Sequence, residues 1–211
     1  MTRDPSTHTL SIGIIGGGFC GAMTAVHLLR NCKGNTSLLL FEAGNDPGKG
    51  VAYSTYSGNH LLNVKAKNMS ALPDDPEHFV RWLMDKGEKG IVPMESIAES
   101  YQPRAAYGTY VAELFSHELR KAGGRLQVIR QRVVGFRKSD DTHVLTVADG
   151  SEYHVDRTVL ATGNFPPGKP KGVPMEFTSS NIYFRDPWSR QAVARYDKNL
   201  PVLIIGTGLT M

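Results

Sequence analysis

The chain has 211 residues, of which 40% are hydrophobic and 21% charged, and a formal net charge of +4 at pH 7. These values are ordinary for a globular protein, and the length suits one domain, or one domain and part of a second. Cys20 and Cys32 are the only cysteines, which excludes a disulfide framework. No apolar run in the sequence is long enough for a membrane-spanning helix. The first residues do not resemble a signal peptide, so we expect a cytoplasmic protein with no membrane partner.

The first predicted unit is a strand, a glycine turn and a helix. The apolar run 9–15 leads into Gly16, Gly18 and Gly21, spaced as G-x-G-x-x-G, and a helical pattern continues to residue 29. In a dinucleotide-binding unit the first glycine permits the tight turn, the second lets the backbone approach a pyrophosphate, and the third lets the helix lie close to its strand. The N–H groups of the first helical turn, which includes Phe19 and Cys20, then face the phosphates.

A second apolar run, 37–41, ends in Glu42, about 20 residues after the turn. An acid at the tip of the second strand is positioned to accept a hydrogen bond from a ribose hydroxyl. Glu42 is compatible with NAD as well as FAD, so a simple NAD-dependent dehydrogenase remains an alternative at this point.

Two helices are expected next. The residues Asp-Asp-Pro-Glu at 74–77 are typical of a helix start, and Gly87 of its end. A second helix is predicted from Pro103 to Ala122. Its aromatic residues recur at helical spacing, and we interpret them as core rather than as a cofactor-binding set.

From residue 126 the hydrophobic period changes to two. The ranges 126–136, 143–148 and 152–155 are predicted to be three short strands. A further apolar strand, 158–161, ends in Thr162 and Gly163, and 201–205 is predicted to be a buried strand that enters Gly-Thr-Gly at 206–208. Basic residues are frequent between 120 and 138, but no nucleic-acid motif or aromatic stacking pattern accompanies them. We interpret them as solvated faces.

A meander followed by a strand that ends in Ala-Thr-Gly at 161–163 resembles the FAD domain of two-dinucleotide-binding flavoproteins. Further motifs resemble a bacterial family of FAD/NAD(P)-binding proteins, which is similar to flavin N-hydroxylating monooxygenases and includes flavin-dependent urate hydroxylases. These motifs are Pro-Gly-Lys-Gly-Val-Ala-Tyr at 47–53, His-Leu-Leu-Asn-Val at 60–64 with Asn-Met-Ser at 68–70, His-Phe-x-x-Trp-Leu at 78–83, and Pro-Arg-x-x-Tyr-Gly-x-Tyr at 103–110.

The resemblance implies an α/β fold, with a Rossmann-like FAD-binding domain at 1–200 that contains a helical insertion at about 65–123 and a β-meander at about 126–155. Residues 201–211 would begin a second domain for NADPH or NADH. The third glycine and the helix of that second motif do not follow in the sequence, so we expect a truncated chain.

The candidate cofactor site starts from Gly16, Gly18, Gly21 and Glu42. Lys49 could neutralise a phosphate or be a solvated turn lysine, and Arg104, at a helix start, could pair with a carboxylate or phosphate or be solvated. The resemblance adds Tyr53, His60 and Asn63 near the isoalloxazine ring, although His60 and Asn63 could instead satisfy loop backbone groups. The set is completed by Val134, Thr162 and Gly163, with a tight strand exit as the alternative role of the last two.

No nucleophile or metal motif stands out, as is expected where a cofactor performs the chemistry. The expected function is that of the FAD-binding portion of an NAD(P)H-dependent flavoprotein oxidoreductase, of monooxygenase type, that hydroxylates a small molecule and needs no nucleic-acid partner. An inactive nucleotide-binding remnant is the alternative from another class. The sequence does not assign an oligomeric state.

Overall fold

The computed structural model describes residues 9–32, 34–44, 46–87, 93–165, 168–186 and 199–205. In chain order the elements are β1 (Leu10–Ile15), α1 (Phe19–Asn31), β2 (Thr36–Phe41), α2 (Gly50–Tyr53), the 3-10 helix η1 (Ala66–Asn68), α3 (His78–Lys86), α4 (Met94–Ala98), α5 (Arg104–Lys121), β3 (Leu126–Ile129), β4 (Val133–Ser139), β5 (Thr142–Val147), β6 (Glu152–Val155), β7 (Arg157–Leu160) and α6 (Met175–Thr178). The predicted α/β class is confirmed.

Four parallel strands form the central sheet of the described part of the chain, in the order β3-β2-β1-β7. The strands are short apolar runs, and β2 alternates buried and half-buried positions before two buried residues at its end. Parallel strands require crossover connections, here made by α1 between β1 and β2 and by a longer segment ending in α5 between β2 and β3. All four carboxyl ends therefore lie at the same edge of the sheet.

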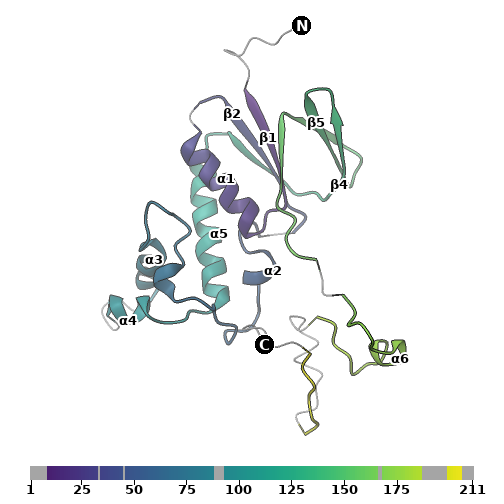
Figure 1. The fold of residues 1–211 in the computed structure, drawn as a ribbon. Coiled ribbons are helices and arrows are strands. Elements are labelled where there is room, and N and C mark those ends of the chain that lie inside the picture. Colours follow the sequence, from purple (N-terminus) through teal and green to yellow (C-terminus); the bar gives the residue numbers. More distant parts are fainter. Residues whose placement is uncertain are drawn as a thin grey trace.

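One face of the sheet is covered by α1 and α5, which pack side by side (Figure 1). Helix α1 buries one apolar stripe, which includes Ala22, Ala25, Val26 and Leu29. Helix α5 buries its own stripe of Tyr107, Tyr110, Val111, Leu114 and Phe115, so its aromatic residues are core, as predicted. Because α5 packs against α1, the predicted insertion at 65–123 includes a helix of the layer that covers the sheet.

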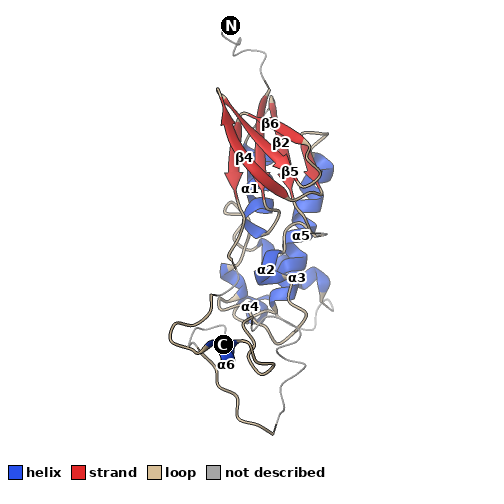
Figure 2. Ribbon diagram, turned by 90° about the vertical axis from the view of Figure 1, so that its right-hand side faces the viewer, coloured by secondary structure: helices blue, strands red, loops and turns tan. Residues whose placement is uncertain are grey.

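The opposite face of the sheet is covered by an antiparallel meander, β4-β5-β6 (Figures 1 and 2). The two sheets approach closely at Gly13, where a Cβ would lie 2.7 Å from Leu145 Cδ1. Asp156 links the meander to the start of β1, because its Oδ2 accepts hydrogen bonds from Ser11 N at 2.8 Å and Ser11 Oγ at 2.7 Å. The result is three layers: helices, parallel sheet and meander.

The structure divides one predicted element and moves the start of another. The predicted strand 126–136 is two strands: β3 pairs with β2 in the parallel sheet, and only β4 belongs to the meander. An irregular segment at 130–132 divides the two strands. Because the hydrophobic alternation continues through it, the sequence does not reveal that the pairing partner changes. Helix α3 begins at His78 rather than at 74–77, because the preceding residues form turns.

The predicted buried strand 201–205 is also wrong. These residues form no strand in the structure, and Val202, Leu203, Ile204 and Ile205 are all more than half exposed. An apolar run becomes a strand only when a neighbouring strand takes up its hydrogen bonds and a core covers its side chains. The glycine motif at 206–208 lies outside the described residues.

Candidate dinucleotide site at the carboxyl edge of the sheet

The glycine turn lies between the ends of β1, β2 and β7. Gly16 has φ +100°, its N–H donates to Phe41 O at 2.9 Å, and a Cβ on it would lie 2.3 Å from Ala161 O. A Cβ on Gly21 would lie 1.8 Å from Gly16 O. Side chains at these two positions would force the helix away from the strand, so the sequence folds this tightly only with glycine.

The first turn of α1 is open to an anion. Gly18 is the N-cap, and a helix leaves the N–H groups of its first residues without intrahelical partners. No acidic residue lies in this turn. A Cβ on Gly18 would lie 3.3 Å from Gly50 Cα, because the 47–53 loop packs against the turn, and Gly48 N donates to Gly17 O at 2.7 Å. The loop thus packs against the side of the turn, and Gly50 allows this close approach. The sequence did not predict this role of Gly50, although the residue lies in the motif at 47–53.

Glu42 lies directly beside the turn. Its Oε2 accepts a hydrogen bond from Gly17 N and its Oε1 one from Gly44 N, both at 2.7 Å. These two backbone donors fix the orientation of the carboxylate, and each carboxylate oxygen has a further lone pair. Ribose hydroxyls could therefore bind to Glu42 without displacing its backbone partners.

The end of β7 completes this edge. Ala161 N donates to Ile15 O at 2.8 Å, and Gly163 has φ +73°. A Cβ on Gly16 would also lie 3.3 Å from Thr162 N, so the predicted residues at 161–163 and the glycine turn are brought together. Thr162 and Gly163 are exposed beside the turn.

A second group of predicted residues adjoins the first through Phe19. The Tyr53 ring lies edge-on to Phe19, with centroids 5.6 Å apart, and to Tyr107, at 4.8 Å. Burial raises the pKa of the Tyr53 phenol, while the nearby Arg104 guanidinium opposes that shift. Arg104 Nε donates to Leu61 O at 2.9 Å, so the structure gives this residue a backbone carbonyl as partner.

The remaining predicted residues lie further from the turn or make local contacts. Lys49 Nζ is 3.2 Å from Asp46 Oδ2, a surface pair. His60 Nδ1 is 2.5 Å from Thr55 Oγ1, and His60 O accepts from Arg104 N, so His60 does organise its loop. Asn63 is exposed, and Val134 is 62% exposed beside a bulge in β4. Their proposed contacts with a cofactor stay predictions.

Two arginines of the basic stretch have structural partners that the sequence did not reveal. Arg125 donates to Cys32 O at 2.8 Å and Leu29 O at 3.2 Å, and so caps the end of α1. Arg130 Nη1 donates to Gly44 O at 3.0 Å, next to the loop that orients Glu42. The interpretation as a solvated residue is therefore wrong for the half-buried Arg125, whereas Arg130 is exposed, as expected.

A protein-family model described as FAD-NAD(P)-binding matches residues 13–165, which is more than half of the chain. The chain belongs to this FAD-NAD(P)-binding family. The matched region runs from β1 past the end of β7, so it contains the glycine turn, Glu42 and Ala161-Thr162-Gly163. No curated protein matches the chain.

Solved structures share the fold of this FAD-NAD(P)-binding chain. The closed form of cyclohexanone monooxygenase matches with a TM-score of 0.55 and 20% identity over 82% of this chain and 29% of its own. The open form matches with a TM-score of 0.52 and 22% identity over 77% of this chain and 30% of its own. OTEMO, solved in complex with FAD and NADP, matches with a TM-score of 0.50 and 16% identity over 79% of this chain and 28% of its own. The chain thus spans less than a third of the length of these proteins.

The residues present fit the adenosine-diphosphate group that FAD and NAD(P) share. The fit rests on a turn that a Cβ would fill, an acid-free helix N-terminus, and an oriented carboxylate at the end of β2. Among the residues that the structure describes, no cluster of His, Cys, Asp and Glu could hold a metal ion. No helix in the same residues is long and apolar enough to cross a bilayer.

Proposed function

We propose that this chain is the FAD-binding portion of an NAD(P)H-dependent flavoprotein oxidoreductase of monooxygenase type, which hydroxylates a small molecule. The observation that supports this proposal most directly is that the glycine turn, Glu42 and the end of β7 meet at one edge of the sheet. Family membership and the shared fold with flavin monooxygenases support it. Both cysteines are free, which is consistent with a protein of the reducing cytoplasm.

In this proposal the first turn of α1 binds the pyrophosphate through its backbone N–H groups. Glu42 accepts hydrogen bonds from the ribose of the adenosine, held in place by Gly17 N and Gly44 N. Bound FAD would supply hydride and oxygen chemistry, with NADPH or NADH as the reductant. The protein's own residues bind and orient the cofactor, so we assign no side chain as nucleophile.

The test is a binding experiment with three ligands. The purified chain is titrated with FAD, FMN and NAD, and binding is followed by flavin fluorescence and by calorimetry. FAD should bind, and FMN, which lacks the adenosine, should bind more weakly. Tight NAD binding without FAD binding would overturn the proposal in favour of an NAD-dependent dehydrogenase.

A second experiment separates a working enzyme from an inactive remnant. NADPH and then NADH are added anaerobically to the FAD-loaded protein, and the flavin absorbance is followed. Bleaching would exclude the remnant. If the flavin stays oxidised in this chain, the same assay on a longer gene product, extended through a second glycine motif and helix, decides between the two.

A further inference from the structure

A continuous row of aromatic rings leads away from the candidate dinucleotide site. It starts at Phe19 and Tyr53 beside the glycine turn and passes to Tyr107, whose ring centroid is 4.8 Å from that of Tyr53. The ring centroid of Tyr110 is 5.6 Å from that of Tyr107 and 5.6 Å from that of Trp82. Four of these five side chains are tyrosine or tryptophan, the side chains that lose a single electron most readily.

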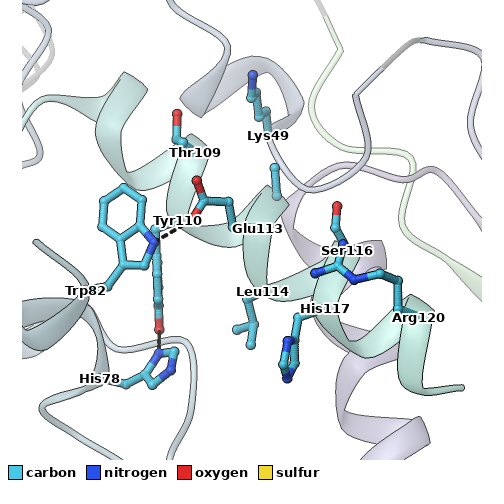
Figure 3. A pocket seen from close by; sticks show the side chains of 11 residues that line it. Lys49, His78, Trp82, Thr109, Tyr110, Glu113, Leu114, Ser116, His117 and Arg120 are labelled. Carbon is cyan, nitrogen blue, oxygen red and sulfur yellow. Dashed lines mark hydrogen bonds between the residues drawn. The ribbon is translucent and has the colours of Figure 1, made fainter. Parts of the chain in front are cut away.

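The middle of the row is buried and its far end meets solvent. Tyr107 and Tyr110 are 2% and 0% exposed. Trp82 is half-buried and lines an open pocket of about 530 Å³ between α3 and α5 (Figure 3). Three basic side chains, Lys49, His117 and Arg120, also line this pocket.

The last two members of the row have a proton acceptor in place. Tyr110 Oη is 2.8 Å from His78 Nδ1 (Figure 3), and the same oxygen accepts a hydrogen bond from Ala71 N. In the neutral tautomer of His78 that carries its proton on Nε2, Nδ1 accepts the phenol proton. Burial holds the pKa of His78 below its usual value, which keeps the ring neutral at pH 7. Trp82 Nε1 donates to Glu113 Oε2 at 2.8 Å.

These acceptors matter because one-electron oxidation makes a phenol a strong acid and makes an indole N–H far more acidic than in the neutral ring. An oxidised phenol or indole is stabilised when its proton moves along an existing hydrogen bond, and the proton returns when the electron is restored. Lys86 lies 5.5 Å from the Trp82 ring centroid and would repel an indole cation. Lys86 Nζ is also 2.7 Å from Glu113 Oε1 and holds the pKa of that carboxyl below its usual value, so Glu113 is ionised and available as an acceptor. Transfer of the indole proton to Glu113 leaves a neutral ring.

We propose that Tyr53, Tyr107, Tyr110 and Trp82 form an electron-transfer route that carries oxidising equivalents from the cofactor end of α1 to the surface. The inference rests on the proposed function, since an oxygen-using flavin site is where a stray one-electron oxidant, such as an oxygen-derived radical, would arise. The oxidant gains one electron, and Trp82 finally loses it together with the indole proton, which passes to Glu113. Tyr110 acts on the way, with its proton held by His78 until the electron is replaced.

The pocket indicates what restores Trp82. A small soluble reductant can reach the indole there. The charged side chains that line the pocket are Lys49, Arg120 and Glu113, so their sum favours an anionic reductant of low charge. The reductant gives one electron to the ring, and Glu113 returns the proton. Ascorbate is a suitable probe of this chemical class.

The route can be tested without FAD, so its failure is distinguishable from failure of the proposed function. A Cys32→Ser/Trp188→Phe background leaves Cys20, exposed in the first turn of α1, as the only thiol and Trp82 as the only tryptophan. A ruthenium photosensitiser on Cys20 is oxidised by flash and quencher, and tryptophan radical formation is followed by transient absorption. Ascorbate is then added at increasing concentration.

The expected result is a tryptophan radical that Trp82→Phe abolishes and that ascorbate removes in a concentration-dependent way. Tyr107→Phe/Tyr110→Phe, which keeps the rings and removes the oxidisable phenols, should reduce the signal to that of Trp82→Phe. Phe79→Leu is the packing control: Phe79 touches Tyr107 and Tyr110 but is not oxidisable, so its loss should leave the radical yield unchanged. Folding of each variant is checked by circular dichroism.

Two outcomes would overturn the route. One is a Trp82 radical that forms equally fast in the double tyrosine variant, which would mean direct oxidation through solvent. The other is no tryptophan radical in the folded background protein.

Discussion

Replacement of Gly21 by alanine tests the closest approach in the candidate site. The added Cβ would lie 1.8 Å from Gly16 O and 3.4 Å from Ala161 Cβ. Backbone at Gly16 cannot rotate away as a side chain could, so α1 must shift along the sheet. Overpacking of this kind costs about 1–3 kcal/mol or more, and alanine regains only about 1 kcal/mol of helix propensity. We expect a net loss of about 2 kcal/mol.

The assay is thermal unfolding with and without FAD. A loss of about 2 kcal/mol corresponds to a fall in Tm of about 4–8 °C for a chain of this size. Gly58→Ala is the matched control, because a Cβ there would meet nothing within 4 Å. Gly21→Ala should also lose FAD binding because the N–H groups of α1 are displaced. An unchanged Tm together with unchanged FAD affinity would refute the packing argument.

Three further predictions concern charge and hydrogen bonding. In Glu42→Gln the side-chain oxygen can accept only one of the two backbone N–H groups that Glu42 accepts at 2.7 Å. FAD binding measured by calorimetry should therefore weaken about tenfold or more. FMN binding should not change in this variant, and FAD binding should not change in Glu95→Gln, the control at an exposed site. Asp156→Asn removes the charged acceptor of two hydrogen bonds from Ser11 and should lower the free energy of unfolding, measured in urea, by about 2 kcal/mol. A loss no greater than that of Asp141→Asn, at an exposed position, would contradict the link between the meander and β1. Burial lowers the pKa of His78 below its usual value of 6.5 in the folded protein. The contribution of His78 to stability is therefore present above pH 6.5 and is lost as the pH falls through the lowered pKa. The fall in Tm on acidification should be smaller in His78→Gln than in the unchanged protein, and should not be smaller in His27→Gln.

Much of the candidate site could be predicted from the sequence because its requirements are local. A strand that ends in G-x-G-x-x-G specifies a turn, a close helix and a free set of N–H groups within a few residues of each other. The acid at the tip of the next strand follows from the length of one βα unit. For the same reason the predicted ends of α5 agree with the structure to within a residue, since Pro103 and Gly123 mark them directly.

The errors arose where a residue's role depends on a distant partner. The alternation of 126–136 is the same whether a strand pairs with β2 or with β5, and only the sheet decides this. Arg125 and Arg130 donate to carbonyl groups 86 to 96 residues away in the sequence, which no local pattern records. The apolar run 201–205 has strand composition but no partner strand among the residues that the structure describes.

The sequence by itself determined the dinucleotide turn, the acid at the tip of β2, the α/β class and the resemblance to FAD/NAD(P)-binding proteins. These depend on backbone conformations that glycine alone adopts and on hydrophobic periods read over a few residues. The tertiary structure alone decided that Glu42 is held by two backbone N–H groups, and that the meander covers one face of the sheet. It also aligned Tyr53, Tyr107, Tyr110 and Trp82 in one row, because contacts between distant segments form only when the whole chain packs.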